Sequence, residues 1–449
     1  MGRLFGTDGV RGIANSELTP ELAFNLGKAG AFVLGKNVER PVVVIAKDTR
    51  ISGDMLEDAI SAGILAMGGN VIKIGVLPTP AVAYLTQLFK ADAGVVISAS
   101  HNPFEYNGIK FFNSKGFKLD DDIEDEIEDI ILRNIDVNSH ITGEKIGRCV
   151  ECEDDALTLY AKSLEATIDV RFDGIKVVID CANGASYKVA EKILSDLGAE
   201  VVAIHNEPDG ININHDCGST HPQLLQAKVV SEKAHLGLAF DGDADRLIGV
   251  DENGQIVDGD KLLYICTKML KNDGVLKDNK VTATVMSNIG FYQAIEAIGC
   301  SVDTTNVGDR YVLESMLKTG CIIGGEQSGH IIFLNHTTTG DGILSGIQVL
   351  RALKLDGRPI SQMANEVTIY PQILVNALIK NENKKKYENH PVVKLEIERI
   401  NGIMDGAGRV LIRPSGTEPL VRVMLEGRDV DMIKELAVGL AKLITQHLG

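Results

Sequence analysis

Residues 93–103 read AGVVISASHNP, an apolar run followed at once by a short polar loop. The run from Ala93 to Ile97 has the length and composition of a buried strand, so we expect a strand to deliver Ser100 into the loop. Loops at strand ends often carry the chemistry of an α/β protein. A serine before Asn-Pro is also typical of a structural turn, and the loop alone does not separate the two interpretations.

A second polar stretch, Asp241-Gly242-Asp243-Ala244-Asp245, places three carboxylates on alternate residues with small residues between them. Such carboxylates can converge on one ion, and all-oxygen ligands favour magnesium, calcium or manganese over zinc. The calcium loop of an EF-hand opens with the same spacing, but Arg246 stands where that loop needs glycine. The run therefore predicts a divalent cation site of a different kind.

Together, Ser100 and the aspartates indicate phosphoryl transfer. A free serine hydroxyl is a poor nucleophile, and we expect the side chain of its neighbour His101 to point away from it. A serine that already carries a phosphoryl group needs a cation to neutralise roughly two negative charges.

Two further loops carry polar groups. The stretch 324–330, GGEQSGH, combines a carboxylate, a hydroxyl and an imidazole, which suits hydrogen bonds to sugar hydroxyls. The stretch 413–419, RPSGTEP, followed by Arg422, offers backbone amides, hydroxyls and guanidinium groups at one turn, and this set suits a phosphate dianion. An ordinary Pro/Gly hairpin is the alternative for the second loop.

Strand, helix and strand follow one another in three segments of the chain. They are 42–97, 176–204 and 281–306. This alternation predicts parallel or mixed sheets covered by helices. After residue 370 the pattern changes to the strands 373–379, 409–412 and 420–425 and a helix at 430–447, which indicates a smaller α+β domain.

The amino-acid composition is ordinary for a soluble globular protein. The chain has 449 residues, 44% of them hydrophobic and 24% charged. Its net charge of −17 argues against nucleic acid and anionic membranes as partners. An anionic ligand stays compatible with it, because charges beyond roughly 8 Å are screened and local cations decide.

We see neither an amino-terminal leader nor an apolar run near the roughly 20 residues that span a bilayer, so we expect a cytoplasmic protein. Seven scattered cysteines indicate reduced thiols, and the pair Cys149 and Cys152 has no second pair at zinc-finger spacing. The oligomeric state stays open, with a homodimer as one option.

The four motifs, in this order and at these separations, resemble the α-D-phosphohexomutase superfamily over essentially the whole chain. Within it, the stretches 5–12 (FGTDGVRG) and 100–110 (SHNPFEYNGIK) and Gln327 resemble the branch that acts on glucosamine phosphates. Relatives that act on mannose or glucose phosphates usually carry methionine at the position of Gln327.

The resemblance implies an α/β fold with three similar mixed-sheet α/β domains and a smaller C-terminal α+β domain around a central cleft. We place the phosphoserine loop in domain 1–155, the metal-binding loop in 156–255, the sugar-binding loop in 256–370 and the phosphate-binding loop in 371–449.

The resemblance also implies roles for individual residues. Ser100 would carry the phosphoryl group, and Mg²⁺ would be bound by one oxygen of that group and by Asp241, Asp243 and Asp245. Groups around the reacting phosphorus would be Arg11, Lys110, Arg246 and His330, with Lys110 the first and His330 the second candidate for proton transfer. Residues for sugar hydroxyls would be Glu326 and Ser328, and those for the distal phosphate would be Arg413, Ser415, Gly416, Thr417 and Arg422.

The implied activity is an isomerisation by intramolecular phosphate exchange. Glucosamine 6-phosphate would be converted reversibly into glucosamine 1-phosphate through glucosamine 1,6-bisphosphate, which would also serve as activator, and the product would feed UDP-N-acetylglucosamine and cell-wall precursor synthesis. One alternative is the same chemistry on mannose or glucose phosphates. Another is a catalytically silent regulatory protein that binds phosphosugars or metal on the same scaffold.

Overall fold

The structure is a computed structural model that describes residues 4–6, 8–36, 38–137, 141–384, 386–415 and 418–449. The chain divides into two compact units. Unit 1 comprises Met1–Met286 and Val302–Asn365, and unit 2 comprises Ser287–Ser301 and Glu366–Gly449. Among the described residues, every helix is too short or too polar to pass through a lipid bilayer.

The first sheet of unit 1 presents the Ser100 loop. Its described strands run in the order β1-β5-β4-β2-β3-β6. They are β1 (Val10–Ile13), β2 (Val42–Lys47), β3 (Asn70–Val76), β4 (Ala93–Ile97), β5 (Tyr106–Asn113) and β6 (Cys149–Glu151). Strand β4 runs parallel to β2 and antiparallel to β5, so the chain reverses between β4 and β5 and leaves Ser100 in the reversal.

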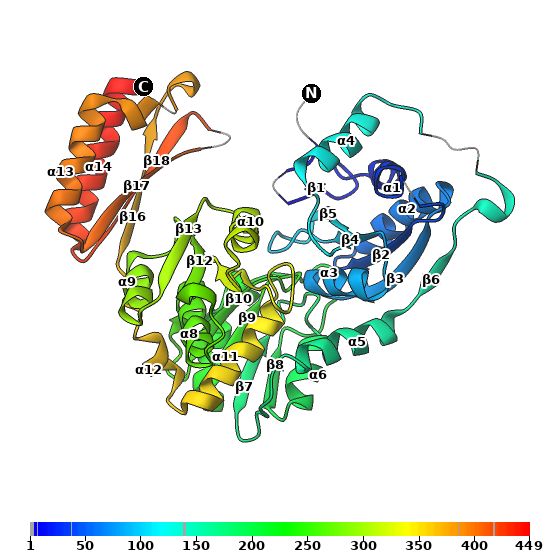
Figure 1. Ribbon diagram of the computed structural model, residues 1–449, viewed down its shortest axis with the longest axis horizontal. Helices are drawn as coiled ribbons and strands as arrows, with labels where there is room; N and C mark the ends of the chain where they lie inside the picture. The colour runs from blue at the N-terminus through cyan, green and yellow to red at the C-terminus, as the bar shows by residue number, and fades with distance from the viewer. Residues whose placement is uncertain (1–3, 7, 37, 138–140, 385, 416–417) are drawn as a thin grey trace. The chain divides into compact units, whose positions relative to one another are not determined.

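Helices cover this sheet because its central strands are apolar on both faces (Figure 1). Every residue of β4 is buried, as expected for a strand with helices or packed loops on each side. The helices that pack here include α1 (Pro20–Leu34), α2 (Gly53–Ala66), α3 (Thr79–Leu88) and α4 (Asp121–Leu132).

The other two sheets of unit 1 repeat the same reversal. One has the order β11-β10-β9-β7-β8 and the other β13-β12-β14-β15 among the described residues. Their strands are β7 (Lys176–Asp180), β8 (Glu200–Ile204), β9 (Leu236–Phe240), β10 (Leu247–Asp251), β11 (Ile256–Val257), β12 (Lys280–Thr284), β13 (Ser301–Thr305), β14 (Ile323–Gly325) and β15 (Ile331–Phe333). The aspartate loop joins β9 to its antiparallel partner β10, and the Glu326 loop joins β14 to β15.

Unit 2 is an antiparallel sheet with helices on one face. Its strands β16 (Gln372–Leu378), β18 (Leu420–Gly427) and β17 (Gly408–Pro414) lie side by side in that order. Helices α13 (Pro391–Met404) and α14 (Val430–Leu448) lie against it, as Figure 1 shows. Their apolar side chains are buried in the core that they share with the sheet. The turn between β17 and β18 carries the predicted phosphate loop.

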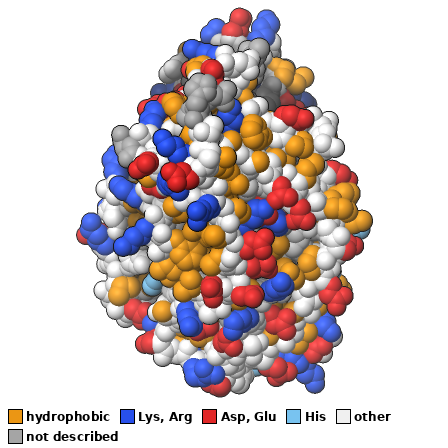
Figure 2. All heavy atoms as spheres, turned by 90° about the vertical axis from the view of Figure 1, so that its right-hand side faces the viewer, with side chains coloured by type: hydrophobic (Ala, Val, Ile, Leu, Met, Phe, Trp, Pro, Cys, Tyr) orange, Lys and Arg blue, Asp and Glu red, His pale blue; other side chains and the backbone are white. Residues whose placement is uncertain are grey.

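Charged side chains of both signs are interspersed with small apolar areas on the face of the molecule seen in Figure 2. The predicted fold class is confirmed, since the three sheets of unit 1 are mixed and covered by helices, and unit 2 is a smaller α+β unit.

Helix α6 (Val189–Asp196) follows a turn in which Ala182 and Asn183 take the left-handed backbone conformation. Strand β14 is short, so the loop that carries Glu326 begins directly after Gly325.

Candidate active site

Ser100 is held in a strained conformation with its hydroxyl on an aspartate. Its φ is +51°, in the left-handed region that residues with a side chain seldom adopt, and it is only 2% exposed. The hydroxyl donates a hydrogen bond to Oδ2 of Asp241 over 2.6 Å. The strained backbone and this hydrogen bond together hold the Ser100 hydroxyl beside the aspartate loop.

Buried polar groups hold the Ser100 loop in place. Arg50 donates from Nη2 to the carbonyl oxygens of Ser100 and Asn102, each over 2.9 Å. Its Nε lies 2.9 Å from Oδ2 of Asp48, which also accepts a hydrogen bond from the Ser98 hydroxyl. Because these side chains are almost completely buried, the loop is rigid before any ligand arrives.

The three aspartates converge as their spacing predicted. One carboxylate oxygen from each of Asp241, Asp243 and Asp245 lies within 4.8 Å of the others, and all three residues are buried. The Oδ1 atoms of Asp243 and Asp245 are buried without a hydrogen-bond partner among the described residues. A buried carboxylate oxygen without a partner lowers the stability of the fold. A hard divalent cation such as Mg²⁺, which prefers oxygen ligands, would supply the missing partner for these oxygens.

The pKa values of these carboxyls show how crowded the negative charge is. Burial, followed by the neighbouring Asp245 and Asp243, raises the pKa of Asp241 well above its usual range. Burial also opposes ionisation of Asp245, but His330, Lys110 and Arg246 outweigh it and lower the pKa of that carboxyl. A bound cation would relieve the repulsion among the three.

Asp243 receives two donors on its second oxygen. The hydroxyl of Thr79 donates to Oδ2 over 2.7 Å, and Nζ of Lys110 donates to the same oxygen over 2.8 Å. Burial would lower the pKa of Lys110, but Asp243 and Asp8 raise it above its usual value, so the ammonium stays charged. Lys110 therefore provides a fixed positive charge at the site.

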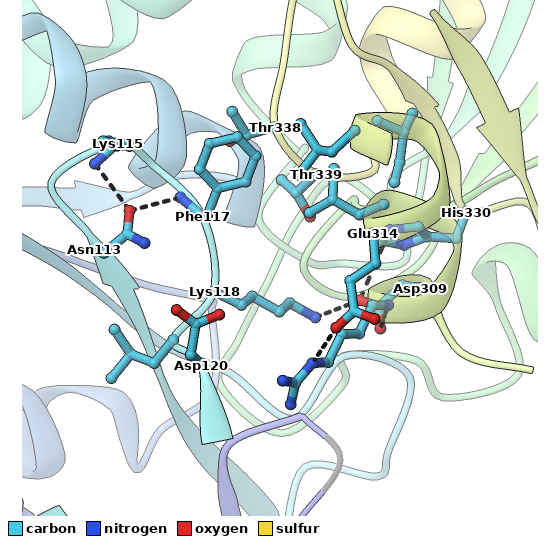
Figure 3. A pocket seen from close by; sticks show the side chains of 15 residues that line it. Asn113, Lys115, Phe117, Lys118, Asp120, Asp309, Glu314, His330, Thr338 and Thr339 are labelled. Atoms are coloured by element: carbon cyan, nitrogen blue, oxygen red, sulfur yellow. Dashed lines mark hydrogen bonds and ion pairs between the residues drawn. The ribbon is translucent and has the colours of Figure 1, made fainter. Parts of the chain in front are cut away.

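From Lys110, acidic and basic side chains alternate along one face of the site. Nζ of Lys110 lies 2.9 Å from Asp8, whose other oxygen is 2.5 Å from Nζ of Lys118. Lys118 also pairs with Asp309, and Figure 3 shows these two side chains pointing toward each other across a cavity. The sequence did not predict that Asp8, Thr79, Lys118 and Asp309 belong to the site, although Asp8 lies inside the quoted stretch 5–12.

His330 lies behind the aspartates. It is 2% exposed, its Nδ1 is 3.6 Å from Oδ2 of Asp245, and its Nε2 accepts a hydrogen bond from the backbone of Gly340 over 3.0 Å. Burial lowers the pKa of His330, but Asp245 and Asp309 raise it above the usual value. These contacts suit His330 to orient Asp245.

The two predicted arginines line a second cavity, which shares Asp309 and His330 with the cavity of Figure 3. Arg11 forms an ion pair with Asp8, and the backbone N–H of Arg246 donates to Oδ1 of Asp241 over 3.1 Å. The Nε of Arg246 is buried and has no hydrogen-bond partner in the described part of the chain. This second cavity, which lies in unit 1, has a volume of about 700 Å³.

Of the two predicted sugar-binding residues, Glu326 lines this cavity and Ser328 is not among its lining residues. Oε1 of Glu326 accepts a hydrogen bond from the backbone of Gly308 over 3.1 Å. Ser328 is exposed in the same turn. The volume is within the range of about 300–1,000 Å³ that is typical of small-molecule sites.

His101 contradicts our expectation that it points away from Ser100. Its Nδ1 lies 3.3 Å from the Ser100 hydroxyl oxygen, and the ring lines the cavity. In an extended loop, the side chains of adjacent residues point to opposite sides. The left-handed backbone conformation at Ser100 turns the side chains of Ser100 and His101 toward each other instead. Burial, with Arg246 and Arg11, lowers the pKa of His101, so its imidazole is neutral at neutral pH.

In unit 2, the phosphate loop gathers positive charge. Arg413 and Arg422 are directly opposite each other on β17 and β18. Burial and the charge of Arg422 lower the pKa of Arg413. Like charges that face each other across two strands are destabilising, and an anion between them removes this cost.

The turn beyond these arginines is only partly described. Ser415 is buried, and its hydroxyl accepts a hydrogen bond from the backbone of Glu418 over 3.2 Å. Gly416 and Thr417 lie outside the described residues.

Models of the phosphoglucomutase/phosphomannomutase family match most of the chain. Alpha/beta/alpha domains I, II and III match residues 2–137, 158–254 and 258–370, and the C-terminal domain matches residues 374–443. A phosphoglucosamine mutase of Alkaliphilus oremlandii (strain OhILAs) is 56% identical over 450 residues and is aligned over 100% of both chains.

Solved structures agree in fold. A phosphoglucomutase/phosphomannomutase family protein from Burkholderia thailandensis has a TM-score of 0.80 at 25% identity, with 98% of this chain and 97% of that chain covered. The Aspergillus fumigatus N-acetylphosphoglucosamine mutase, solved in complex with GlcNAc-6P and magnesium, has a TM-score of 0.70 at 18% identity, with 99% and 95% covered.

Proposed function

Because this chain belongs to the phosphoglucomutase/phosphomannomutase family and its full-length relatives are phosphoglucosamine mutases, we propose that it interconverts glucosamine 6-phosphate and glucosamine 1-phosphate. It is a phosphohexomutase, an isomerase that moves a phosphoryl group within its sugar substrate. The alternative substrates, mannose and glucose phosphates, are not favoured, since relatives at about 55% identity over the whole chain are phosphoglucosamine mutases.

The observation that carries the proposal is the contact between Ser100 and Asp241 at 2.6 Å, beside two further buried carboxylates that have unpaired oxygens. We propose that Asp241, Asp243 and Asp245 hold Mg²⁺ together with an oxygen of phosphorylated Ser100. Mg²⁺ bound there supplies positive charge that stabilises the transferring phosphoryl group.

The first transfer breaks the bond between phosphorus and the Ser100 oxygen and forms a bond from phosphorus to the free sugar hydroxyl. The hydroxyl loses its proton, and the Ser100 oxygen gains one. The product state of this residue is the hydroxyl that donates to Asp241 in the structure. The sugar is then a 1,6-bisphosphate, and after it turns end for end it returns its other phosphoryl group to Ser100.

Proton transfer needs a group near the Ser100 oxygen. Lys110 and His330 were the predicted candidates. We propose His101 as a third, because its Nδ1 lies 3.3 Å from that oxygen and its ring lines the cavity. Lys110 is better suited to hold Asp243 and to offset negative charge, since two carboxylates surround its ammonium group.

Recognition of the rest of the substrate is assigned to three sets of residues. We propose that Glu326 and Ser328 bind sugar hydroxyls and that Arg11 and Arg246 contact the reacting phosphate. The distal phosphate would be bound in unit 2 by Arg413, Ser415, Gly416, Thr417 and Arg422.

We further propose a cytoplasmic location, because seven scattered cysteines in a large chain are typical of proteins from a reducing compartment. The homodimer stays a prediction, which light scattering of the eluted protein would test.

The test of the proposed function is a coupled assay of the purified protein. Glucosamine 6-phosphate, glucose 6-phosphate and mannose 6-phosphate are compared with Mg²⁺, with and without glucosamine 1,6-bisphosphate as activator. We expect glucosamine 6-phosphate to give the highest kcat/KM and the bisphosphate to raise the rate by phosphorylating Ser100. Faster turnover of mannose or glucose phosphate would overturn the substrate assignment, and absence of turnover of all three would overturn the enzyme assignment.

A further inference from the structure

A second group of metal-ligating side chains lies away from the three aspartates, behind the Ser100 loop. Asp180 ends β7, His205 directly follows β8, and Cys217 directly precedes the short helix η2 (Gly218–Thr220). One ligand atom from each of these residues lies within 4.8 Å of the others. Ligand atoms of a tetrahedral zinc site lie about 3.3–3.7 Å apart, so side-chain rotations that shorten the widest separations by about 1 Å would bring all three atoms onto one ion.

We propose that Asp180, His205 and Cys217 form a second cation site, specific for a transition ion such as Zn²⁺. A thiolate, an imidazole and a carboxylate are the ligands that Zn²⁺ takes in tetrahedral sites, with water in the fourth position. Mg²⁺ prefers oxygen ligands in octahedral geometry and does not suit this set. The two cation sites therefore differ in the metal they select.

The carboxylate of Asp180 is already oriented. Its Oδ1 accepts a hydrogen bond from the backbone of Ala182 over 2.9 Å, and its Oδ2 accepts one from the backbone of Gly218 over 3.0 Å. The residue is completely buried. Carboxylates that ligate metals are commonly fixed by such outer hydrogen bonds, which leave a lone pair on each oxygen for the ion.

The imidazole of His205 faces the same carboxylate. Its Nδ1 lies 3.0 Å from Oδ2 of Asp180, a contact that is an ion pair when the ring is protonated. In a tetrahedral zinc site, a nitrogen ligand and an oxygen ligand at neighbouring corners lie about 3.3 Å apart. The side chain is 22% exposed, which leaves a path for an ion from solvent.

An ion at this site would cross-link three segments that support the reacting serine. The loop between His205 and Cys217 contains Asn214, whose backbone N–H donates to Ala182 O over 2.9 Å. The side-chain amide of Asn214 donates to the carbonyl oxygens of Ser100 and Asn102 over 2.9 and 3.0 Å. The second site would thereby stabilise the loop that positions Ser100.

The test uses Co²⁺, because only a sulfur ligand produces a thiolate-to-cobalt charge-transfer band in the near ultraviolet. The full-length protein is kept reduced with a phosphine and titrated with Co²⁺ in excess Mg²⁺. The aspartate trio contains no sulfur, so binding there is silent in this band. We expect the band to saturate at one ion per chain and to be displaced by Zn²⁺.

Variants assign the band to residues. Cys217→Ser should abolish it, and His205→Ala should weaken Co²⁺ binding at least roughly tenfold. The matched control replaces Cys149, which is exposed, and Cys152, which is partly exposed, in the double variant Cys149→Ser with Cys152→Ser, and should retain the band. Absence of the band in the wild-type protein, its survival in Cys217→Ser, or its loss in the control overturns the proposal.

If Cys217→Ser does not fold, X-ray absorption of the zinc-loaded control variant decides instead. A sulfur neighbour together with nitrogen or oxygen neighbours supports the site, and nitrogen and oxygen neighbours alone overturn it. Neither measurement depends on mutase activity, so failure of the second site is distinguishable from failure of the proposed function.

Discussion

Thr79 makes a sharp prediction because its side chain touches the proposed cation site through a single hydrogen bond. The residue begins helix α3 and is completely buried. Its hydroxyl donates to Oδ2 of Asp243 over 2.7 Å, while its backbone N–H donates to the carbonyl oxygen of the same residue over 3.0 Å. Thr79→Val keeps the shape of the side chain and the backbone contact and removes only the hydroxyl.

The expected magnitude follows from the lost contact. A hydrogen bond to a charged group contributes about 1.5–3 kcal/mol, which corresponds to a roughly 10- to 100-fold change in an equilibrium constant. Loss of an outer partner of a metal ligand has a similar typical effect on metal affinity. Asp243 keeps its contact with Lys110, so we expect the carboxylate to stay in place but to be less well oriented.

The assay is a Mg²⁺ titration of mutase activity. Thr79→Val should raise the half-saturating Mg²⁺ concentration roughly 10- to 100-fold and change kcat at saturating Mg²⁺ much less. Thr79→Ser should restore the wild-type value. Thr86→Val is the matched control, since Thr86 lies in the same helix, is completely buried, and its hydroxyl has no hydrogen-bond partner among the described residues. An unchanged Mg²⁺ requirement in Thr79→Val, equal to that of the control, would refute the reasoning.

Three other variants test separate parts of the protein. Ser100→Ala should reduce turnover to background in the coupled assay while leaving the melting temperature and sugar-phosphate binding near wild type; comparable turnover would remove Ser100 from its role. Arg413→Ala should raise the apparent KM for glucosamine 6-phosphate roughly tenfold or more with kcat less affected, whereas the exposed Arg399→Ala in the same unit should leave both unchanged. Asp341 is buried and accepts a hydrogen bond from the Tyr160 hydroxyl. Burial raises the pKa of Asp341 to about 6. The contribution of this carboxyl to the stability of the fold is therefore fully present below about pH 4 and is lost as pH rises through about 6. The wild-type melting temperature should therefore fall relative to Asp341→Asn between pH 4 and pH 7, by the equivalent of about 3 kcal/mol, and parallel curves would contradict this.

Much of the site was predictable because its main groups are local in the sequence. Three aspartates on alternate residues after a strand can reach one ion whatever the rest of the chain does, and the structure confirms that they converge. The hairpin turns after β4, β9 and β14 are likewise short-range features. Hydrophobic runs followed by polar loops were enough to locate them.

Other parts of the site depended on contacts between distant residues. Lys118 pairs with Asp309, which is 191 positions away, and Thr79 contacts Asp243 across 164 positions. Periodicity and composition carry no signal for such pairs. His101 was wrongly expected to point away from Ser100, because the left-handed φ that brings the two side chains together is imposed by Arg50 and Asn214 on the loop.

The amino-acid sequence alone determined the α/β class, the four polar loops and the kind of chemistry, since each depends on residues within a few positions of one another. Tertiary structure decided which of the remaining charged groups lie near Ser100, and it assembled Asp180, His205 and Cys217 from three separate segments. The physical reason is burial. A carboxylate or ammonium group removed from water must find a partner, and only the folded chain determines which one lies within reach.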